Sequence, residues 1–263
     1  MKALVFERYG KAEEVLGVQD VPEPTPGPGE VKVKLFYSPI NPSDVNNTVE
    51  GTYRDTLADA IWNFDKPESE YTMDPAGLRP LASVPGVPGI EGVGVVVEAG
   101  PGLLPRLLKG KRVAVVGGKR GNWQEYNVVD ARQALPVKGG VEDEQAACSF
   151  VNPVTAWAMV RRQLHCGGGD VLLQSAGNSE CGKMVARLGK RFGYQTVSIV
   201  RNGAQAERLL AEGADHVIDS SSEDLRARVY ELTRGQGVRH ALDPIAGSLA
   251  TDMIGCLGLN GTL

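Results

Sequence analysis

The stretch GDVLLQSAGNSECG, residues 169–182, decides the fold of the second half of this 263-residue chain. Its apolar run at residues 171–174 predicts a strand, the small residues after it predict a turn, and a helix is expected from residue 179 onward. A strand, a tight turn and a helix in this order are typical of the start of a βαβ unit.

Strands and helices continue to alternate from this turn to the end of the chain. The further strands are expected at residues 196–200, 216–218 and 240–243. The helices are expected at residues 142–164, 179–192, 204–212, 222–233 and 248–257. Such alternation predicts an α/β architecture, a doubly wound parallel sheet with right-handed crossovers.

The first half is rich in Gly, Pro and Val and has a different rhythm. Its strands are expected at residues 31–36, 92–97 and 112–116. Short strands separated by Gly and Pro predict a partly open β-barrel. Residues 54–81 are polar and mixed, and we interpret them as an insertion loop with a short helix near residues 57–64. We therefore expect two domains, residues 1–128 and 129–263.

Composition excludes several classes of function. The formal net charge is −4 and no Lys/Arg run occurs, which argues against a nucleic-acid partner. No apolar stretch is long enough to span a membrane, and the N-terminus lacks the layout of a signal peptide. The four cysteines are widely spaced, without a CxxC pair, so we expect no disulfide framework and a cytoplasmic location.

The turn after the first strand of the second half is suited to a dinucleotide pyrophosphate. Small residues let the backbone approach the phosphates, and the helix N-terminus supplies free N–H groups and partial positive charge. The strict GxGxxG pattern is absent, so a tight turn in any doubly wound protein remains an alternative. The candidate cofactor-binding residues in this segment are Ser175, Asn178, Ser179, Glu180, Cys181 and Gly182.

The end of the next strand indicates which dinucleotide is bound. Arg201 and Asn202 stand about twenty residues past the turn, where an NAD site usually carries Asp or Glu for the ribose 2′-hydroxyl. An arginine there can pair with a 2′-phosphate, which predicts NADPH as the cofactor. A solvated arginine at a strand end is the alternative interpretation.

Three motifs carry a resemblance to a known family. They are SPINPSD at residues 38–44 followed by GTY at 51–53, PGIEGVG at 88–94, and VNPVTAW at 151–157 followed by Asn178-Ser179. The chain resembles the zinc-independent medium-chain dehydrogenases/reductases, in the branch of quinone oxidoreductases and 2-enoyl thioester reductases. The resemblance implies a GroES-like catalytic domain and a Rossmann domain, with the active site in the cleft between them.

The resemblance also bears on metal binding. In the zinc alcohol dehydrogenases of this superfamily, a Cys ligand occupies the place of Asn41 and a His ligand the place of Ile90. Ile90 cannot bind a metal and Asn41 is a poor zinc ligand. We therefore expect no metal.

Without zinc, hydrogen-bond donors must polarise the substrate carbonyl while a hydride from NADPH reduces an activated double bond. In the resembled reductases a Tyr placed like Tyr53 serves the substrate, so Tyr53 is the candidate acid or donor; an ordinary half-buried loop aromatic is the alternative. The resemblance assigns Asn41, Asn152 and Thr155 to the cofactor, although Asn152 also suits a helix cap. We interpret Cys181 as a packing residue rather than an activated thiolate.

The resemblance implies a trans-2-enoyl thioester of coenzyme A or acyl carrier protein as the substrate. An NADPH:quinone oxidoreductase is the alternative activity, and a non-catalytic NADPH-binding protein is the alternative of another class. The 54–81 insertion follows Tyr53, so we expect it to act as a lid or to reshape the acyl pocket. The chain ends at Leu263, near the start of the fifth Rossmann strand, so we expect a truncated chain, and a homodimer only if the missing strands are present.

Overall fold

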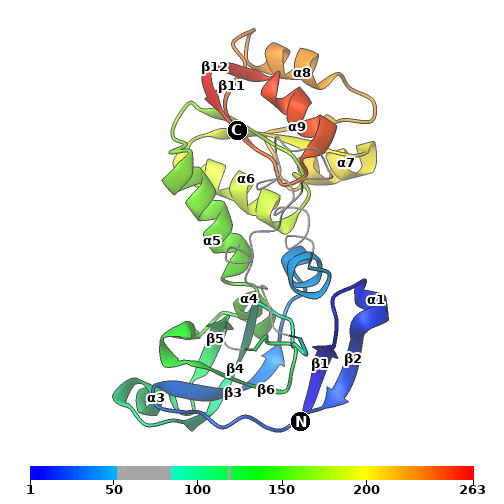
Figure 1. Ribbon diagram of the computed structural model, residues 1–263. Helices are drawn as coiled ribbons and strands as arrows, with labels where there is room; N and C mark the ends of the chain where they lie inside the picture. The colour runs from blue at the N-terminus through cyan, green and yellow to red at the C-terminus, as the bar shows by residue number, and fades with distance from the viewer. Residues whose placement is uncertain (52–83, 118–119) are drawn as a thin grey trace. The chain divides into compact units, whose positions relative to one another are not determined.

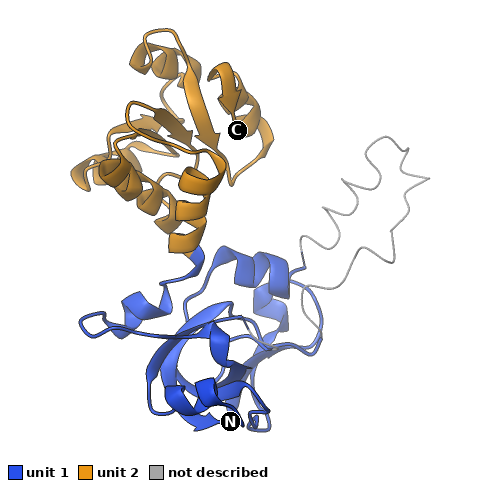
Figure 2. Ribbon diagram, turned by 90° about the vertical axis from the view of Figure 1, so that its left-hand side faces the viewer, with its two compact units in different colours: residues 1–151 blue, residues 152–263 orange. Residues whose placement is uncertain are grey.

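The structure is a computed structural model that describes residues 1–51, 84–117 and 120–263 (Figure 1). The predicted insertion at 54–81 and its short helix lie outside the described residues. The chain forms two compact units, Met1–Val151 and Asn152–Leu263 (Figure 2). Within the described ranges, no helix is long and apolar enough to cross a membrane.

Unit 1 contains an antiparallel sheet with the strand order β6-β3-β4-β5-β7 and a separate β1–β2 hairpin. Its strands are β1 (Lys2–Phe6), β2 (Leu16–Asp20), β3 (Glu30–Tyr37), β4 (Glu91–Ala99), β5 (Arg112–Val116), β6 (Tyr126–Asp130) and β7 (Ala134–Pro136). Its helical segments are α1 (Ala12–Val15), η1 (Asp44–Val49), α3 (Leu103–Leu108), η4 (Ala131–Gln133) and α4 (Asp143–Ala147).

The alternating pattern of β3 explains its place in the sheet. Val31 and Val33 are fully buried and pack in one cluster with Val113 and Val115 of β5. Lys32 lies between the two valines in sequence, so its side chain points to the opposite face, where its ammonium pairs with Glu23 at 2.9 Å and with Glu98 at 2.5 Å. The predicted strands at residues 31–36, 92–97 and 112–116 are confirmed.

Unit 1 extends further along the chain than the domain boundary expected between residues 128 and 129. The short strand β7 pairs with β5, and Ala146 and Ala147 of α4 pack against Val93 of β4. These contacts bring residues 134–151 into the first unit. The functional domain boundary itself stays a prediction.

Unit 2 contains a parallel five-stranded sheet with the order β10-β9-β8-β11-β12. Its strands are β8 (Val171–Gln174), β9 (Gln195–Val200), β10 (His216–Asp219), β11 (Val238–Leu242) and β12 (Leu257–Thr262). The helical segments are α5 (Val151–Trp157), η5 (Ala158–Gln163), α6 (Glu180–Phe192), α7 (Gly203–Ala211), α8 (Leu225–Leu232) and α9 (Gly247–Ile254), the first residue of α5 belonging to unit 1. The predicted alternation of strands and helices is confirmed.

Adjacent residues of β8 point to opposite faces of this sheet and anchor two different cores. Leu172 packs with Val160 and Val185, so η5 and α6 cover one face. Leu173 packs with Ile218 and Met253, and α8 and α9 cover the other face (Figure 1). Both leucines are fully buried, as expected for a strand covered on two sides.

The helix expected over residues 142–164 is wrong in one respect, because the segment is divided into α4, α5 and η5. α5 begins at Val151, and Pro153 lies in its first turn, where a missing N–H costs little. The amides of Phe150 and Val151 donate to the Glu91 carboxylate, which stops the preceding helix from continuing through them.

Candidate functional site

The strand order of unit 2 marks one edge of its sheet as the place for a ligand. The chain proceeds from β8 to β9 and β10 on one side, and returns to place β11 and β12 on the other side of β8. The order therefore reverses between β8 and β11. Ligands of open α/β sheets bind outside the carboxyl ends of the strands at this switch point.

Two glycines shape the turn that follows β8. A Cβ on Gly177 would lie 2.5 Å from the Cβ of Ser198, and a Cβ on Gly182 would lie 2.8 Å from the Ala176 carbonyl oxygen. Both distances are shorter than real side chains allow, so this turn requires glycine. The Ser179 hydroxyl caps α6 by accepting the Gly182 amide at 3.0 Å.

The start of α6 also offers groups to a ligand. The amides of Glu180 and Cys181 donate to no acceptor in the described part of the chain. The Oδ1 atom of Asn178 is buried and has no hydrogen-bond partner among the same residues. Free amides at a helix N-terminus suit a diphosphate, and an orphaned buried acceptor calls for a donor from water or a ligand. The turn therefore fits the dinucleotide expected from the sequence.

Gln174 holds this turn in place, although the sequence analysis did not select it. Its side chain is buried, and Nε2 donates to the Gly182 carbonyl and to Ser198 Oγ, both at 3.0 Å. These two bonds tie the first turn of α6 to β9. The available signal was a polar residue at the end of an otherwise apolar strand.

Arg201 and Asn202 follow β9, the strand next to β8. Arg201 is exposed, and its guanidinium has no partner within residues 1–51, 84–117 and 120–263. Asn202 Oδ1 accepts the Gln205 amide at 3.0 Å and so caps α7. The Arg201 guanidinium is thus available to bind an anion, whereas the Asn202 side chain already caps α7.

Glu180 and Cys181 contribute to the turn through their backbones. The carboxylate of Glu180 pairs with the ammonium of Lys183 at 3.1 Å. Cys181 packs against the cluster around Leu172, and burial raises the pKa of its thiol. A raised pKa disfavours the thiolate, which agrees with the interpretation of Cys181 as a packing residue.

The remaining candidates of unit 2 lie on α5 or directly after β8. Asn152 and Thr155 lie on α5, where Thr155 is exposed. Ser175 is buried, and its hydroxyl donates to the carboxylate of Asp243 at the end of β11. Asp243 was not selected from the sequence, and the cofactor roles of the other three stay predictions.

Unit 1 holds Asn41 in a hydrogen-bonded loop after β3. Asp44 is fully buried, and its carboxylate accepts the amides of Asn41 at 2.9 Å and Ile90 at 2.8 Å. Burial raises the pKa of Asp44, and these two hydrogen bonds oppose the rise. The loop is therefore fixed by a carboxylate rather than by a metal-binding pair.

Glu91 is a second buried carboxylate beside this loop. Its Oε1 accepts Asn41 Nδ2 at 3.2 Å, and its Oε2 accepts the amides of Phe150 and Val151 at 3.0 Å each. No cluster of three or more His, Cys, Asp or Glu side chains that could hold a metal occurs among the described residues. The absence of a metal in the natural protein stays a prediction.

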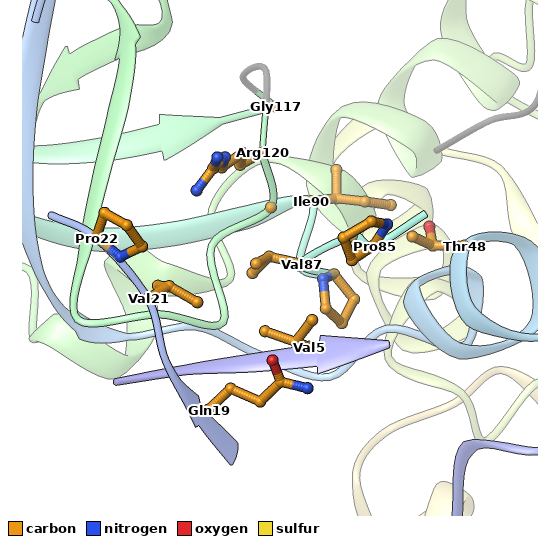
Figure 3. A pocket seen from close by; sticks show the side chains of 14 residues that line it. Val5, Gln19, Val21, Pro22, Thr48, Pro85, Val87, Ile90, Gly117 and Arg120 are labelled. Carbon is orange, nitrogen blue, oxygen red and sulfur yellow. The ribbon is translucent and has the colours of Figure 1, made fainter. Parts of the chain in front are cut away.

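Unit 1 also contains a cavity of about 430 Å³ (Figure 3). Val5, Val87 and Ile90 form apolar walls, while Gln19 and Arg120 add polar groups at its sides. The walls suit an apolar group of a ligand, and the arginine suits an anionic one. Tyr53, the candidate catalytic residue, lies outside the described residues.

Comparisons with known proteins support both halves of this description. Residues 27–139 match the family model "Alcohol dehydrogenase GroES-like domain", and residues 181–263 match "Zinc-binding dehydrogenase". The Caenorhabditis elegans protein "Enoyl-[acyl-carrier-protein] reductase, mitochondrial" is 30% identical, over 99% of this chain and 69% of its own length. Its counterpart from Xenopus tropicalis is 31% identical, over 100% of this chain and 68% of its own.

Solved structures of related oxidoreductases superpose on almost the whole chain. A putative NADPH:quinone reductase from Bacillus thuringiensis superposes with a TM-score of 0.84 and 33% identity, covering 99% of this chain and 70% of its own. A mycobacterial protein complexed with NADPH gives a TM-score of 0.82 and 25% identity, covering 100% of this chain and 73% of its own. The expected GroES-like and Rossmann folds are confirmed, and the chain belongs to the medium-chain dehydrogenase/reductase family of oxidoreductases.

Proposed function

We propose that this chain carries the NADPH-dependent reduction of an activated carbon–carbon double bond, with a trans-2-enoyl thioester of coenzyme A or acyl carrier protein as substrate. The observation that carries the proposal is the glycine turn before α6 together with the exposed Arg201 directly after the neighbouring strand, whose guanidinium has no partner among the described residues. Relatives named enoyl-[acyl-carrier-protein] reductases match the chain along its whole length, which supports this substrate class.

The cofactor assignment depends on charge and access. Arg201 is exposed, so its guanidinium can form a bidentate pair with a ribose 2′-phosphate. The amides of Glu180 and Cys181 would hold the diphosphate, and Asn178 Oδ1 would accept a hydrogen bond from a hydroxyl or a water at its edge. NADH lacks the 2′-phosphate, so Arg201 favours NADPH.

NADPH, when bound, supplies the hydride that the β-carbon of the substrate receives. Negative charge then gathers on the substrate carbonyl oxygen, and hydrogen-bond donors of the protein must stabilise it. We assign this role, or protonation of the α-carbon, to Tyr53. Asn41 is held by Glu91 and Asp44 at the place of a zinc ligand in the metal-dependent branch, and we assign it, with Asn152 and Thr155, to the cofactor.

An NADPH:quinone oxidoreductase activity is the second candidate. The solved structure from Bacillus thuringiensis bears that name and covers 99% of this chain. A quinone is flat and carries its own carbonyl oxygens, so the same donors would serve it. A protein that binds NADPH without turnover is the candidate of a different class.

One assay separates these candidates. NADPH oxidation is followed by its absorbance with crotonyl-CoA and with a simple quinone as substrates. Turnover of crotonyl-CoA supports the proposal, and turnover of the quinone alone supports the second candidate. NADPH binding without turnover of either substrate contradicts both enzyme assignments. Tyr53→Phe should reduce crotonyl-CoA turnover by about 10²-fold or more if Tyr53 is the acid.

The cofactor assignment has its own test. Arg201→Asp should weaken NADPH binding at least about tenfold more than NADH binding, because a charge-assisted pair is lost and a repulsion is added. Arg191→Asp is the matched control, because Arg191 is exposed in the last turn of α6, far along the helix from the turn. Equal weakening of NADPH and NADH by Arg201→Asp refutes the 2′-phosphate role.

Compartment and assembly remain at the level of prediction. The chain is expected in the cytoplasm, whereas the enoyl reductase relatives are named mitochondrial. A homodimer is the assembly to be tested. Fractionation of cells that express the tagged full-length protein, and light scattering of the purified protein, would measure the two properties.

A further inference from the structure

A side-chain hydrogen bond between Ser175 and Asp243 spans the switch point of the parallel sheet, between β8 and β11. β8 and β11 are parallel neighbours there, and the Ser175 amide extends their ladder by donating to the Leu242 carbonyl at 3.0 Å. Directly after β11, the carboxylate of Asp243 accepts the hydroxyl of Ser175. The two side chains thus join the carboxyl ends of the two strands between which a ligand is expected.

The same carboxylate organises the loop that follows β11. It accepts the amide of Ile245 at 3.0 Å and that of Ala246 at 2.8 Å. Burial opposes the charged form of Asp243, but the hydrogen bonds from Ser175 and from the two amides outweigh it and lower its pKa. Asp243 is therefore ionised at neutral pH, and each of its bonds is charge-assisted.

The loop contains a strained backbone. Ala246 has φ 63° and ψ −163°, a conformation that is accessible to glycine and costly for a residue with a Cβ. Such a conformation persists only where the surroundings impose it, and it is frequent in ligand clamps. Here the bond from the Ala246 amide to Asp243 imposes it.

The position of this loop indicates which half of a dinucleotide it meets. Arg201 follows β9 on one side of β8, and Asp243 follows β11 on the other side. If the diphosphate lies at the central turn and the 2′-phosphate lies at Arg201, the adenosine half extends toward β9. The nicotinamide ribose half then extends toward β11 and its exposed loop, residues 244–247.

We propose that Asp243 is a positioning residue for the nicotinamide half of NADPH. By bonding Ser175 and the Ala246 amide together, it holds the loop after β11 in the one shape on which that half rests. The inference depends on the proposed function, because it requires NADPH as the ligand.

Two ligands separate this role from general damage to the fold. NADPH contains both halves, whereas adenosine 2′,5′-bisphosphate contains only the adenosine half. Asp243→Asn replaces one carboxylate oxygen by an NH2 group, which cannot accept the bonds that the carboxylate accepts. It should raise the Kd for NADPH about tenfold and leave the Kd for the bisphosphate within about twofold. Asp252→Asn, at an exposed site on α9, is the matched control.

A second variant tests the strain itself. Ala246→Gly removes the Cβ, so the loop can adopt its conformation without the hydrogen bond to Asp243. Alone, it should raise the Tm and leave the Kd for NADPH unchanged. Added to Asp243→Asn, it should recover part of the lost NADPH affinity, a recovery that a purely structural role of Asp243 would not produce.

The outcomes are distinct. Selective loss of NADPH affinity in Asp243→Asn, with recovery by Ala246→Gly, supports the inference. Equal loss for both ligands, or unchanged NADPH affinity in a folded Asp243→Asn variant, overturns the inference and leaves the proposed function standing. A wild-type chain that binds neither ligand overturns both.

Discussion

The carboxylate of Glu91 joins the side-chain amide of Asn41 to the start of α5. Its Oε1 accepts Asn41 Nδ2 at 3.2 Å, and its Oε2 accepts the amides of Phe150 and Val151 at 3.0 Å. The glutamate is 1% exposed, so these donors replace the water that a carboxylate would otherwise bind. One side chain thereby fixes a candidate cofactor residue and the last residues of unit 1.

Glu91→Gln should destabilise unit 1. The substitution keeps the size of the side chain but turns one acceptor into an NH2 donor, which must face either Asn41 Nδ2 or the two amides. Leaving buried donors unpaired costs about 1–3 kcal/mol, and we expect the free energy of unfolding in urea to fall by that amount. Glu13→Gln, at an exposed site on α1, is the control, and an equal loss there would contradict the interpretation.

Gly177→Ala should damage the turn before α6. Its Cβ would meet Ser198 Cβ at 2.5 Å, so the turn or β9 must shift. Overpacking of this kind costs about 1–3 kcal/mol, and a displaced turn should weaken NADPH binding about tenfold. Gly168→Ala is the matched control, because no atom lies within 4 Å of its added Cβ. Calorimetric titration with NADPH checks both; similar affinities would remove the steric argument.

Much of the fold follows from local sequence. The predicted strands at residues 112–116 and 171–174 agree with β5 and β8 to the residue, because each is an apolar run bounded by Gly and polar residues. The start of α6 was predicted within one residue from Ser179, which caps it through its own hydroxyl. Short-range chemistry decides such features, so the sequence displays them.

The residues that hold the candidate site together were harder to predict. Three side-chain hydrogen bonds join residues that are far apart in sequence. Gln174 and Ser198 are separated by 24 residues, Glu91 and Asn41 by 50, and Ser175 and Asp243 by 68. None of these pairs has a sequence pattern of its own, because only the folded sheet brings the partners together. The break before α5 was missed for the same reason, since its amides bond a carboxylate from β4.

Cys181→Val should leave NADPH affinity unchanged within about twofold. The thiol packs in the apolar cluster around Leu172, and burial raises its pKa, so a thiolate at the helix start is disfavoured. Valine keeps the apolar contact and differs by roughly one methyl group, a change that cores tolerate at a cost below about 1.5 kcal/mol. NADPH titration checks this prediction. A large loss of affinity would restore the thiolate interpretation.

His240 should make the stability of unit 2 fall as the pH decreases below neutrality. It is 6% exposed in β11, its Nδ1 has no partner among the described residues, and Nε2 lies 3.7 Å from the Asp170 carboxylate. Burial lowers the pKa of His240, and the charge of Arg239 lowers it further, while Asp170 opposes them.

As the pH falls, His240 therefore becomes protonated near pH 6.5 in the unfolded chain, and only at lower pH in the folded chain. Stability is fully present above the unfolded pKa and decreases from there down to the folded pKa, by at most about 1.4 kcal/mol per pH unit. Urea unfolding between about pH 5 and pH 8 measures the slope. His240→Leu should flatten this part of the profile, whereas His216→Leu, at a half-buried position on β10, should keep it. An unchanged slope in His240→Leu would assign the dependence to another group.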